Sequence, residues 1–176
     1  MSPLHNWRPL VLVGFMASGK STIGARLAHR LKLPFVDSDV VIEGAAGMSI
    51  GEIFRTRGER YFREMERQTI LSLLDMTQVI AAGGGAFVDS TTREKLREQA
   101  LTIWLDPGFE ILTSRLSRSS KRPLASNKSN DELRDLWLDR RSFYMHADLH
   151  IQPSHDDPDV TVAEIIESLP ADYPHQ

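Results

Sequence analysis

The chain has 176 residues, of which 41% are hydrophobic and 26% are charged, a composition typical of one soluble globular domain spanning 1–176. It contains no cysteine, which excludes structural disulfides and thiolate metal sites. The formal net charge of -3 gives no reason to expect a nucleic-acid or membrane partner, and residues 1–9 lack the apolar stretch of a signal peptide. We therefore expect a cytoplasmic protein that is a monomer.

Short β-rich runs alternate with longer helical patterns, which predicts an α/β fold with a mostly parallel sheet covered by helices. The expected strands are 10–13, 34–37, 78–82, 101–105 and 149–152. The first is continuously apolar, as a strand buried on both faces requires, and helical spacing follows it from near Gly19. Further helices are expected at 131–147 and 160–169, and we predict that the tail, 170–176, is frayed.

Two long segments interrupt this alternation. The first, about 40–76, is mostly helical and too long for a simple crossover, so we expect a small subdomain over one edge of the sheet. The second, about 115–130, carries five Lys or Arg residues and no acidic residue among many Ser and Asn. Composition alone favours an exposed polar loop, and the functional alternative is a cationic lid that closes over phosphates.

A phosphate-binding sequence follows the first strand. Residues Gly14 to Ser21 fit G-x-x-x-x-G-K-[ST] without a mismatch, between an apolar strand and an amphipathic helix. Gly14 and Gly19 allow a tight turn that points backbone N–H groups at phosphate oxygens, and the helix adds its positive end. Lys20 would reach the β- and γ-phosphates, and the Ser21 hydroxyl would ligate Mg²⁺. Since 176 residues leave little space for a motor's machinery, we predict an ATP-dependent small-molecule kinase.

Two further patterns lie at the ends of expected strands. Asp37 and Asp39 end the second strand, where alternation would direct one carboxylate to the metal and the other to an acceptor substrate. The alternative is an acidic turn that caps the next helix. The run Gly83 to Gly85 follows the third strand, at the end where open α/β sheets bind ligands. It marks either a sharp turn or a close approach of another group to the backbone.

Six sequence blocks resemble the shikimate kinase family, in the family's order and over about residues 9–169. They are Gly14 to Gly24, Asp37-x-Asp39, Phe62-Arg63-x-x-Glu66, Gly83 to Ala86, Arg122-Pro-Leu124, and Arg140 four residues before Tyr144. The resemblance implies a P-loop NTPase fold: a five-stranded parallel sheet flanked by helices (core about 9–170), a substrate-binding subdomain and a mobile lid. It also implies transfer of the γ-phosphate of ATP to the 3-hydroxyl of shikimate, with Mg²⁺, in the chorismate route to aromatic amino acids.

The resemblance further implies roles for individual residues. Asp39 would bind the shikimate hydroxyls and orient or deprotonate the attacking one, with Lys20 and Arg122 as the other catalytic residues. The carboxylate would be held by Arg63 and Arg140. Backbone groups of the glycine run, Gly83, Gly84 and Gly85, would line the pocket, and Asp37 would assist Ser21 at the metal. The nucleotide contacts would be Gly14, Ala17, Ser18, Gly19, Lys20, Ser21, Thr22, Arg115 and the lid residue Arg122.

The chain departs from the family's pattern at two places. Ala17 stands where many members have Gly. Alanine is still small, so the loop should persist if this residue needs no positive φ. The run Arg141-Ser142-Phe143 replaces the usual Pro-Leu before the tyrosine, which leaves Arg141 as a rival to Arg140 for the carboxylate. We prefer Arg140 because its distance to Tyr144 matches.

Two other functions remain open at this point. Another metabolite kinase of the same fold, such as a gluconate kinase, would not need the glycine run or the Arg63 and Arg140 pair. A non-catalytic ligand sensor is disfavoured because Lys20, Asp39 and Arg122 are all present. His146 and His150 are spaced like zinc ligands, but we interpret them as structural or surface residues.

Overall fold

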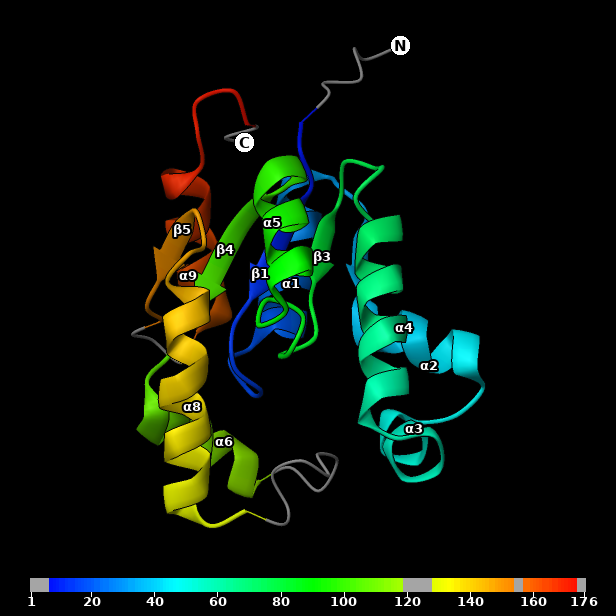
Figure 1. The fold of residues 1–176 in the computed structure, drawn as a ribbon. Helices are drawn as coiled ribbons and strands as arrows, with labels where there is room; N and C mark the ends of the chain where they lie inside the picture. Colours follow the sequence, from blue (N-terminus) through cyan, green and yellow to red (C-terminus); the bar gives the residue numbers. More distant parts are fainter. Residues whose placement is uncertain (1–6, 119–127, 154–156, 174–176) are drawn as a thin grey trace.

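The computed structural model describes residues 7–118, 128–153 and 157–173, and its centre is a five-stranded parallel sheet (Figure 1). The strands are β1 (Leu10–Val13), β2 (Phe35–Asp37), β3 (Val79–Ala81), β4 (Leu101–Leu105) and β5 (Leu149–Ile151). All five predicted strands are confirmed, three of them slightly shorter than expected. The order is β2-β3-β1-β4-β5: β2 and β3 lie on one side of β1 and β4 and β5 on the other, so the direction of winding reverses at β1. Ligands of open α/β sheets bind at the carboxyl ends of the strands beside such a reversal.

Helices cover both faces of this sheet and one of its edges. They are α1 (Lys20–Leu31), α2 (Ser38–Ala46), α3 (Ile50–Arg57), α4 (Glu59–Ser72), α5 (Ser90–Gln99), α6 (Phe109–Ser117), α8 (Asn130–Tyr144) and α9 (Pro158–Ser168). The three helices expected after Gly19, at 131–147 and at 160–169 are α1, α8 and α9. Helices α5 and α6 were not predicted. The polar segment expected from residue 115 begins inside α6, so a loop assignment is wrong for 115–117.

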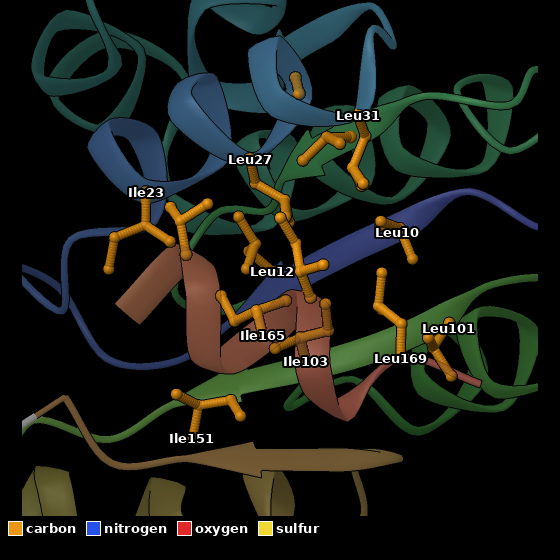
Figure 2. Close-up of a cluster of buried hydrophobic side chains, with 14 of the residues drawn as sticks. Leu10, Leu12, Ile23, Leu27, Leu31, Leu101, Ile103, Ile151, Ile165 and Leu169 are labelled. Atoms are coloured by element: carbon orange, nitrogen blue, oxygen red, sulfur yellow. The ribbon is translucent and has the colours of Figure 1, made fainter. Parts of the chain in front are cut away.

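Successive side chains of β1 point to opposite faces of the sheet, so the main core has two layers, one on each face. Leu10 and Leu12 face one side, where they pack with residues of α1 and α9 such as Leu27 and Ile165 (Figure 2). Val11 and Val13 face the other side, where the contacts come from α4, α5, α6 and α8. Both faces of β1 are therefore buried, which explains its continuous apolar sequence.

Helices α2, α3 and α4 have a small hydrophobic cluster of their own, built on Ile42, Ile53 and Phe62. Figure 1 shows the three helices together on one side of the sheet, with α6 and α8 on the other. Helix α3 begins with a capping box, in which Ser49 accepts from the Glu52 N–H and the Glu52 carboxylate accepts from the Ser49 N–H. The cluster and the cap hold these helices as one unit at the β2 edge.

The end of the chain is more ordered than the sequence predicted. Tyr173 is buried, its ring stacks on Trp7, and its hydroxyl donates to the Arg8 carbonyl. The prediction of a frayed tail is therefore wrong as far as Tyr173, and residues 174–176 lie outside the described residues. Within the three described ranges, no helix combines the length and apolarity that crossing a membrane demands.

Candidate functional site

One cleft of about 1380 Å³ opens at the carboxyl ends of β1, β2 and β3. It reaches from the loop after β1 to helices α2, α3 and α4, and a volume above about 1,000 Å³ exceeds what one small ligand usually needs. Two ligands can therefore lie side by side. The predicted site residues that line the cleft are Ala17, Gly19, Lys20, Ser21, Thr22, Asp37, Asp39, Arg63, Gly84, Gly85, Arg115 and Arg140.

The loop between β1 and α1 has the shape that an anion site requires. Gly14 and Gly19 have φ of 142° and 97°, and a Cβ at Gly14 would lie 2.6 Å from the Leu105 carbonyl oxygen. Lys20 Nζ donates to the carbonyls of Gly14 and Phe15, both at 2.9 Å. Helix α1 begins at Lys20 without a side-chain cap, so its first N–H groups are left for an anion.

Ala17 does adopt a left-handed conformation in this loop, with φ of 63°. The sequence predicted that the loop persists if Ala17 needs no positive φ. Ala17 does have a positive φ, and the loop still keeps the phosphate-binding form. A side chain in this region costs roughly 1 kcal/mol relative to glycine, which a folded domain tolerates at one position. Arg115, from α6, donates to the Ala17 carbonyl at 3.3 Å and so lies against the loop.

Ser21 and Asp37 bring two oxygen donors together beside the loop. Ser21 Oγ donates to Asp37 Oδ2 at 2.5 Å, and Asp37 Oδ1 accepts from the Asp39 N–H at 3.0 Å. Asp37 therefore caps α2, as the simpler interpretation predicted, and still presents an oxygen to Ser21. A hydroxyl and a carboxylate suit Mg²⁺, which takes one or two protein ligands besides phosphate oxygens. Within the described residues, no three or more His, Asp or Glu side chains form a group that could hold a metal ion.

Asp39 faces the cleft with an unusual carboxylate. Its Oδ1 atom is buried and is the one side-chain N or O atom of the described residues that is buried without a hydrogen-bond partner. Burial raises the pKa of Asp39 to about 6, the Asp37 charge adds to this rise, and Lys20 opposes it. An unsatisfied carboxylate that titrates near neutrality can accept a proton or a hydrogen bond from a ligand hydroxyl.

Arg63 and Glu66 form an ion pair close to Asp39. A Cβ at Gly83 would lie 2.5 Å from Glu66 Oε1 and 2.8 Å from Asp39 Oδ1. Their NH1 and Oε2 atoms are 2.7 Å apart, and the Glu66 side chain is 4% exposed. Burial raises the pKa of Glu66, whereas Arg63 and Arg140 lower it. The pair is thus not an ordinary surface pair, and Glu66 fixes NH1 of the Arg63 guanidinium. Its Nε and NH2 donate to the exposed Glu59 carboxylate at 3.3 Å, long contacts that a ligand carboxylate could replace.

The glycine run allows these charged side chains to approach the backbone. A Cβ at Gly83 would lie 2.5 Å from Glu66 Oε1, and a Cβ at Gly85 would collide with Arg63 NH1. At Gly84 the nearest atoms would be 3.6 Å away, an ordinary contact. Of the two interpretations of this run, close approach therefore applies at positions 83 and 85.

The adjacent arginines of α8 point to different places. Arg140 lines the cleft, where its NH1 is 3.4 Å from the Gly84 carbonyl oxygen. Tyr144 donates to the same oxygen, and burial raises the pKa of this tyrosine to about 12. Arg141 instead pairs with Asp106 at 2.7 Å. The geometry favours Arg140 as the arginine available to a ligand.

Three predicted site residues, Gly14, Ser18 and Gly83, support the cleft without lining it, and Arg122 lies outside the described residues. Sequence reasoning missed several residues that line the cleft: Met16, Glu43, Ile50, Phe54, Arg55, Phe62, Pro153, Pro158 and Thr161. The Phe54 and Phe62 rings lie 4.7 Å apart on α3 and α4. The spacing of Phe54 resembles that of a core residue, and Phe62 belongs to the family block with Arg63 but was given no site role.

Comparison with known proteins gives consistent matches. The family model described as shikimate kinase matches residues 16–170. A shikimate kinase of Bradyrhizobium diazoefficiens is 45% identical over 166 residues, which cover 93% of this chain and 80% of that protein. A shikimate kinase from Acinetobacter baumannii, solved in complex with shikimate, has a TM-score of 0.88 at 31% identity and 93% coverage of both chains.

A gluconokinase from Sinorhizobium meliloti is also similar in structure, with a TM-score of 0.55 at 17% identity. It covers 89% of this chain, and the match covers 87% of the gluconokinase. At that identity the similarity extends to the fold alone.

Proposed function

Because the chain belongs to the shikimate kinase family, we propose that it transfers the γ-phosphate of ATP to the 3-hydroxyl of shikimate, in the route to chorismate and the aromatic amino acids. The observation that carries this proposal is that one cleft joins the phosphate loop to Asp39, Arg63 and Arg140. The loop suits a nucleotide phosphate, and the other residues suit a small hydroxylated acid. The products are shikimate 3-phosphate and ADP, and the enzyme acts as a cytoplasmic monomer.

On the donor side, the phosphates lie on the N-terminal turn of α1. Lys20 exchanges its carbonyl partners for the β- and γ-phosphate oxygens, and Arg115 lies over the loop toward the adenine end. Ser21 and Asp37 would hold Mg²⁺, which when bound would neutralise charge on the transferred group. Arg122, outside the described residues, comes onto the phosphates as part of a lid over about 115–130.

On the acceptor side, helices α2, α3 and α4 form the shikimate-binding part of the single domain. The guanidinium groups of Arg63 and Arg140 bind the carboxylate, for which their planar donors are suited. Asp39 accepts the hydrogen of the attacking hydroxyl, since its Oδ1 has no partner in the protein. Backbone groups of Gly84 and Gly85 border the ring, so phosphoryl transfer depends on positioning and charge.

We expect a pH dependence set by Asp39. Since its pKa in the free protein is about 6, protonation below that pH removes the hydrogen-bond acceptor. The value of kcat/KM for shikimate should therefore fall about tenfold per pH unit below about pH 6, because this parameter reports groups of the free enzyme. A rate that stays level to pH 5 would contradict the proposed role of Asp39.

We also expect Gly85→Ala to weaken shikimate binding. The added methyl group would displace the Arg63 guanidinium, because NH1 occupies its position. The KM for shikimate should rise about tenfold or more, with the KM for ATP unchanged. Gly44→Ala, on α2, is the control: its methyl group would meet no atom within 4 Å and Gly44 does not line the cleft, so both KM values should stay within about twofold.

A coupled assay for ADP tests the proposed function. Purified protein with ATP and Mg²⁺ should release ADP only when shikimate is added, and gluconate should not replace it. Equal rates with gluconate, or no turnover by folded protein, would overturn the proposal. Calorimetric binding of both ligands without turnover would instead identify a ligand sensor. Omission of Mg²⁺ in the same assay tests the metal requirement.

A further inference from the structure

Helix α8 carries Arg140 into the cleft, but few of its side chains hold it against the sheet. Of its 15 residues, Leu133 and Tyr144 are buried, and Leu136 and Trp137 are partly buried against the core. Arg140 itself has a long 3.4 Å hydrogen bond to the Gly84 carbonyl, and its guanidinium lies 5.6 Å from the centre of the Phe15 ring. The rotation of α8 about its axis therefore decides where the Arg140 guanidinium points.

Arg141 anchors the same turn of α8 on its other side. Its NH1 is 2.7 Å from Oδ2 of Asp106, whose side chain is 3% exposed. The guanidinium carbon lies 4.7 Å from the ring centre of Trp137 and 5.1 Å from that of Trp104. A planar guanidinium that pairs with a buried carboxylate and contacts two aromatic rings has few alternative orientations.

The partner of Arg141 belongs to the sheet. The Asp106 N–H donates to the Ile151 carbonyl at 2.9 Å, at the carboxyl end of β4. His150 lies 3.3 Å from Asp106 Oδ2 and stacks on Trp104, with 4.0 Å between ring centroids. Asp106 is thus held by the two strands that form this edge of the sheet. This cluster also gives His150 the structural role expected from the sequence.

Trp104 connects this anchor to the cleft. It is 2% exposed, and its ring centroid lies 6.0 Å from that of Tyr144. The Tyr144 hydroxyl donates to the Gly84 carbonyl, which also accepts from Arg140. The ring that Arg141 contacts therefore packs against the tyrosine that shares a backbone acceptor with Arg140.

We propose that Arg141 is a positioning residue, whose ion pair with Asp106 fixes the rotation of α8 and so directs Arg140 toward the substrate carboxylate. The inference rests on the proposed function, in which Arg140 binds that carboxylate. Arg141 is not among the described residues that line the cleft. Because the effect runs through the ion pair, Asp106 and Arg141 should act as one unit, and loss of either should remove the contribution of both.

Steady-state kinetics of Arg141→Leu, Asp106→Asn and the double variant test this inference. Each single variant should raise the KM for shikimate about tenfold and leave the KM for ATP unchanged, because only the carboxylate contact moves. The double variant should show the same tenfold rise and no more. Arg134→Leu is the matched control, since it removes the same charge from α8 at a residue that contacts Phe109 instead. Its KM values should equal those of the wild type.

Thermal unfolding separates positioning from general stability. Arg141→Leu leaves a buried carboxylate without its arginine and should lower the melting temperature, whereas the double variant also removes the carboxylate charge and should recover part of this loss. If destabilisation caused the rise in KM, the KM should recover with the melting temperature. Under the inference it stays raised.

The possible outcomes are distinct. An active wild type with an unchanged shikimate KM in Asp106→Asn would overturn the inference alone, and a raised KM in Arg141→Leu only would indicate direct binding by Arg141. A recovered KM in the double variant would also overturn it. A wild type without shikimate-dependent turnover would overturn the proposed function and this inference together.

Discussion

Asp39→Asn should lower turnover by about a thousandfold while ATP affinity stays within about twofold of the wild type. Asparagine keeps the size of the side chain but cannot take a proton from the attacking hydroxyl. The side chain that meets Ser21 at the nucleotide end is Asp37, so nucleotide binding should persist. Single-turnover measurements with radiolabelled ATP, together with calorimetric titration of ATP, would measure both quantities.

The same substitution should stabilise the fold, which excludes unfolding as the cause of lost activity. The pKa of Asp39 rises from 3.8 to about 6 on folding, so the folded protein binds this proton more tightly than the unfolded chain does. The resulting penalty is absent below about pH 4, grows as the pH rises to about 6, and then stays constant. Above pH 7 it is on the order of 3 kcal/mol, which asparagine would not carry.

Urea unfolding at pH 7.5 and pH 4.5 would test this sign. Asp39→Asn should be more stable than the wild type at the higher pH, and its advantage should shrink at the lower one. Loss of ATP binding instead of turnover would show that the assignment of Asp37 to the metal and Asp39 to the acceptor is wrong.

Lys20→Met should reduce phosphoryl transfer by about a thousandfold, the second large effect that we expect. The ammonium group lies in the loop, 2.9 Å from two carbonyl oxygens, at the position from which it can reach the β- and γ-phosphates. Methionine fills similar space without the charge. Lys95→Met is the matched control, because Lys95 lies on α5 in an exposed ion pair with Glu98.

Lys20→Met should lower the rate of phosphoryl transfer but leave shikimate binding almost unchanged. Shikimate binding, measured by calorimetry, should change little, because Lys20 contacts the loop carbonyls of Gly14 and Phe15, whereas the carboxylate is assigned to Arg63 and Arg140. Activity above about a tenth of the wild-type value would mean that Lys20 does not stabilise the transferred phosphate. The Lys95→Met variant should keep full activity.

The sequence predicted the parts of the fold that depend on strong local patterns. The strands were found because buried parallel strands are short and apolar, and α1 was found because it follows the phosphate loop. Helix α5 was missed because only Thr92 and Leu96 of its ten residues are buried, so its hydrophobic period is weak. Helix α6 was missed in part because its last turn begins the polar segment.

The candidate site shows the same division between local and distant causes. The phosphate loop and the glycine run are each a continuous stretch of sequence, and the sequence analysis identified both. The different directions of Arg140 and Arg141 depend on residues far along the chain, Gly84 and Asp106. No local pattern encodes such contacts, because spacing along a helix gives a side chain's face but not the group that it meets.

The continuity of the cleft has a consequence for inhibition. Arg115, beside the phosphate loop, and Arg63, paired with Glu66, line one space of about 1380 Å³. A single molecule that joins an adenine nucleotide to a cyclic carboxylic acid could occupy both ends at once. After one half binds, the other half is present at a high effective concentration, so the linked compound can bind about 10²- to 10⁴-fold more tightly than either half. The linker length that gives the tightest binding then reports the distance between the two bound substrates.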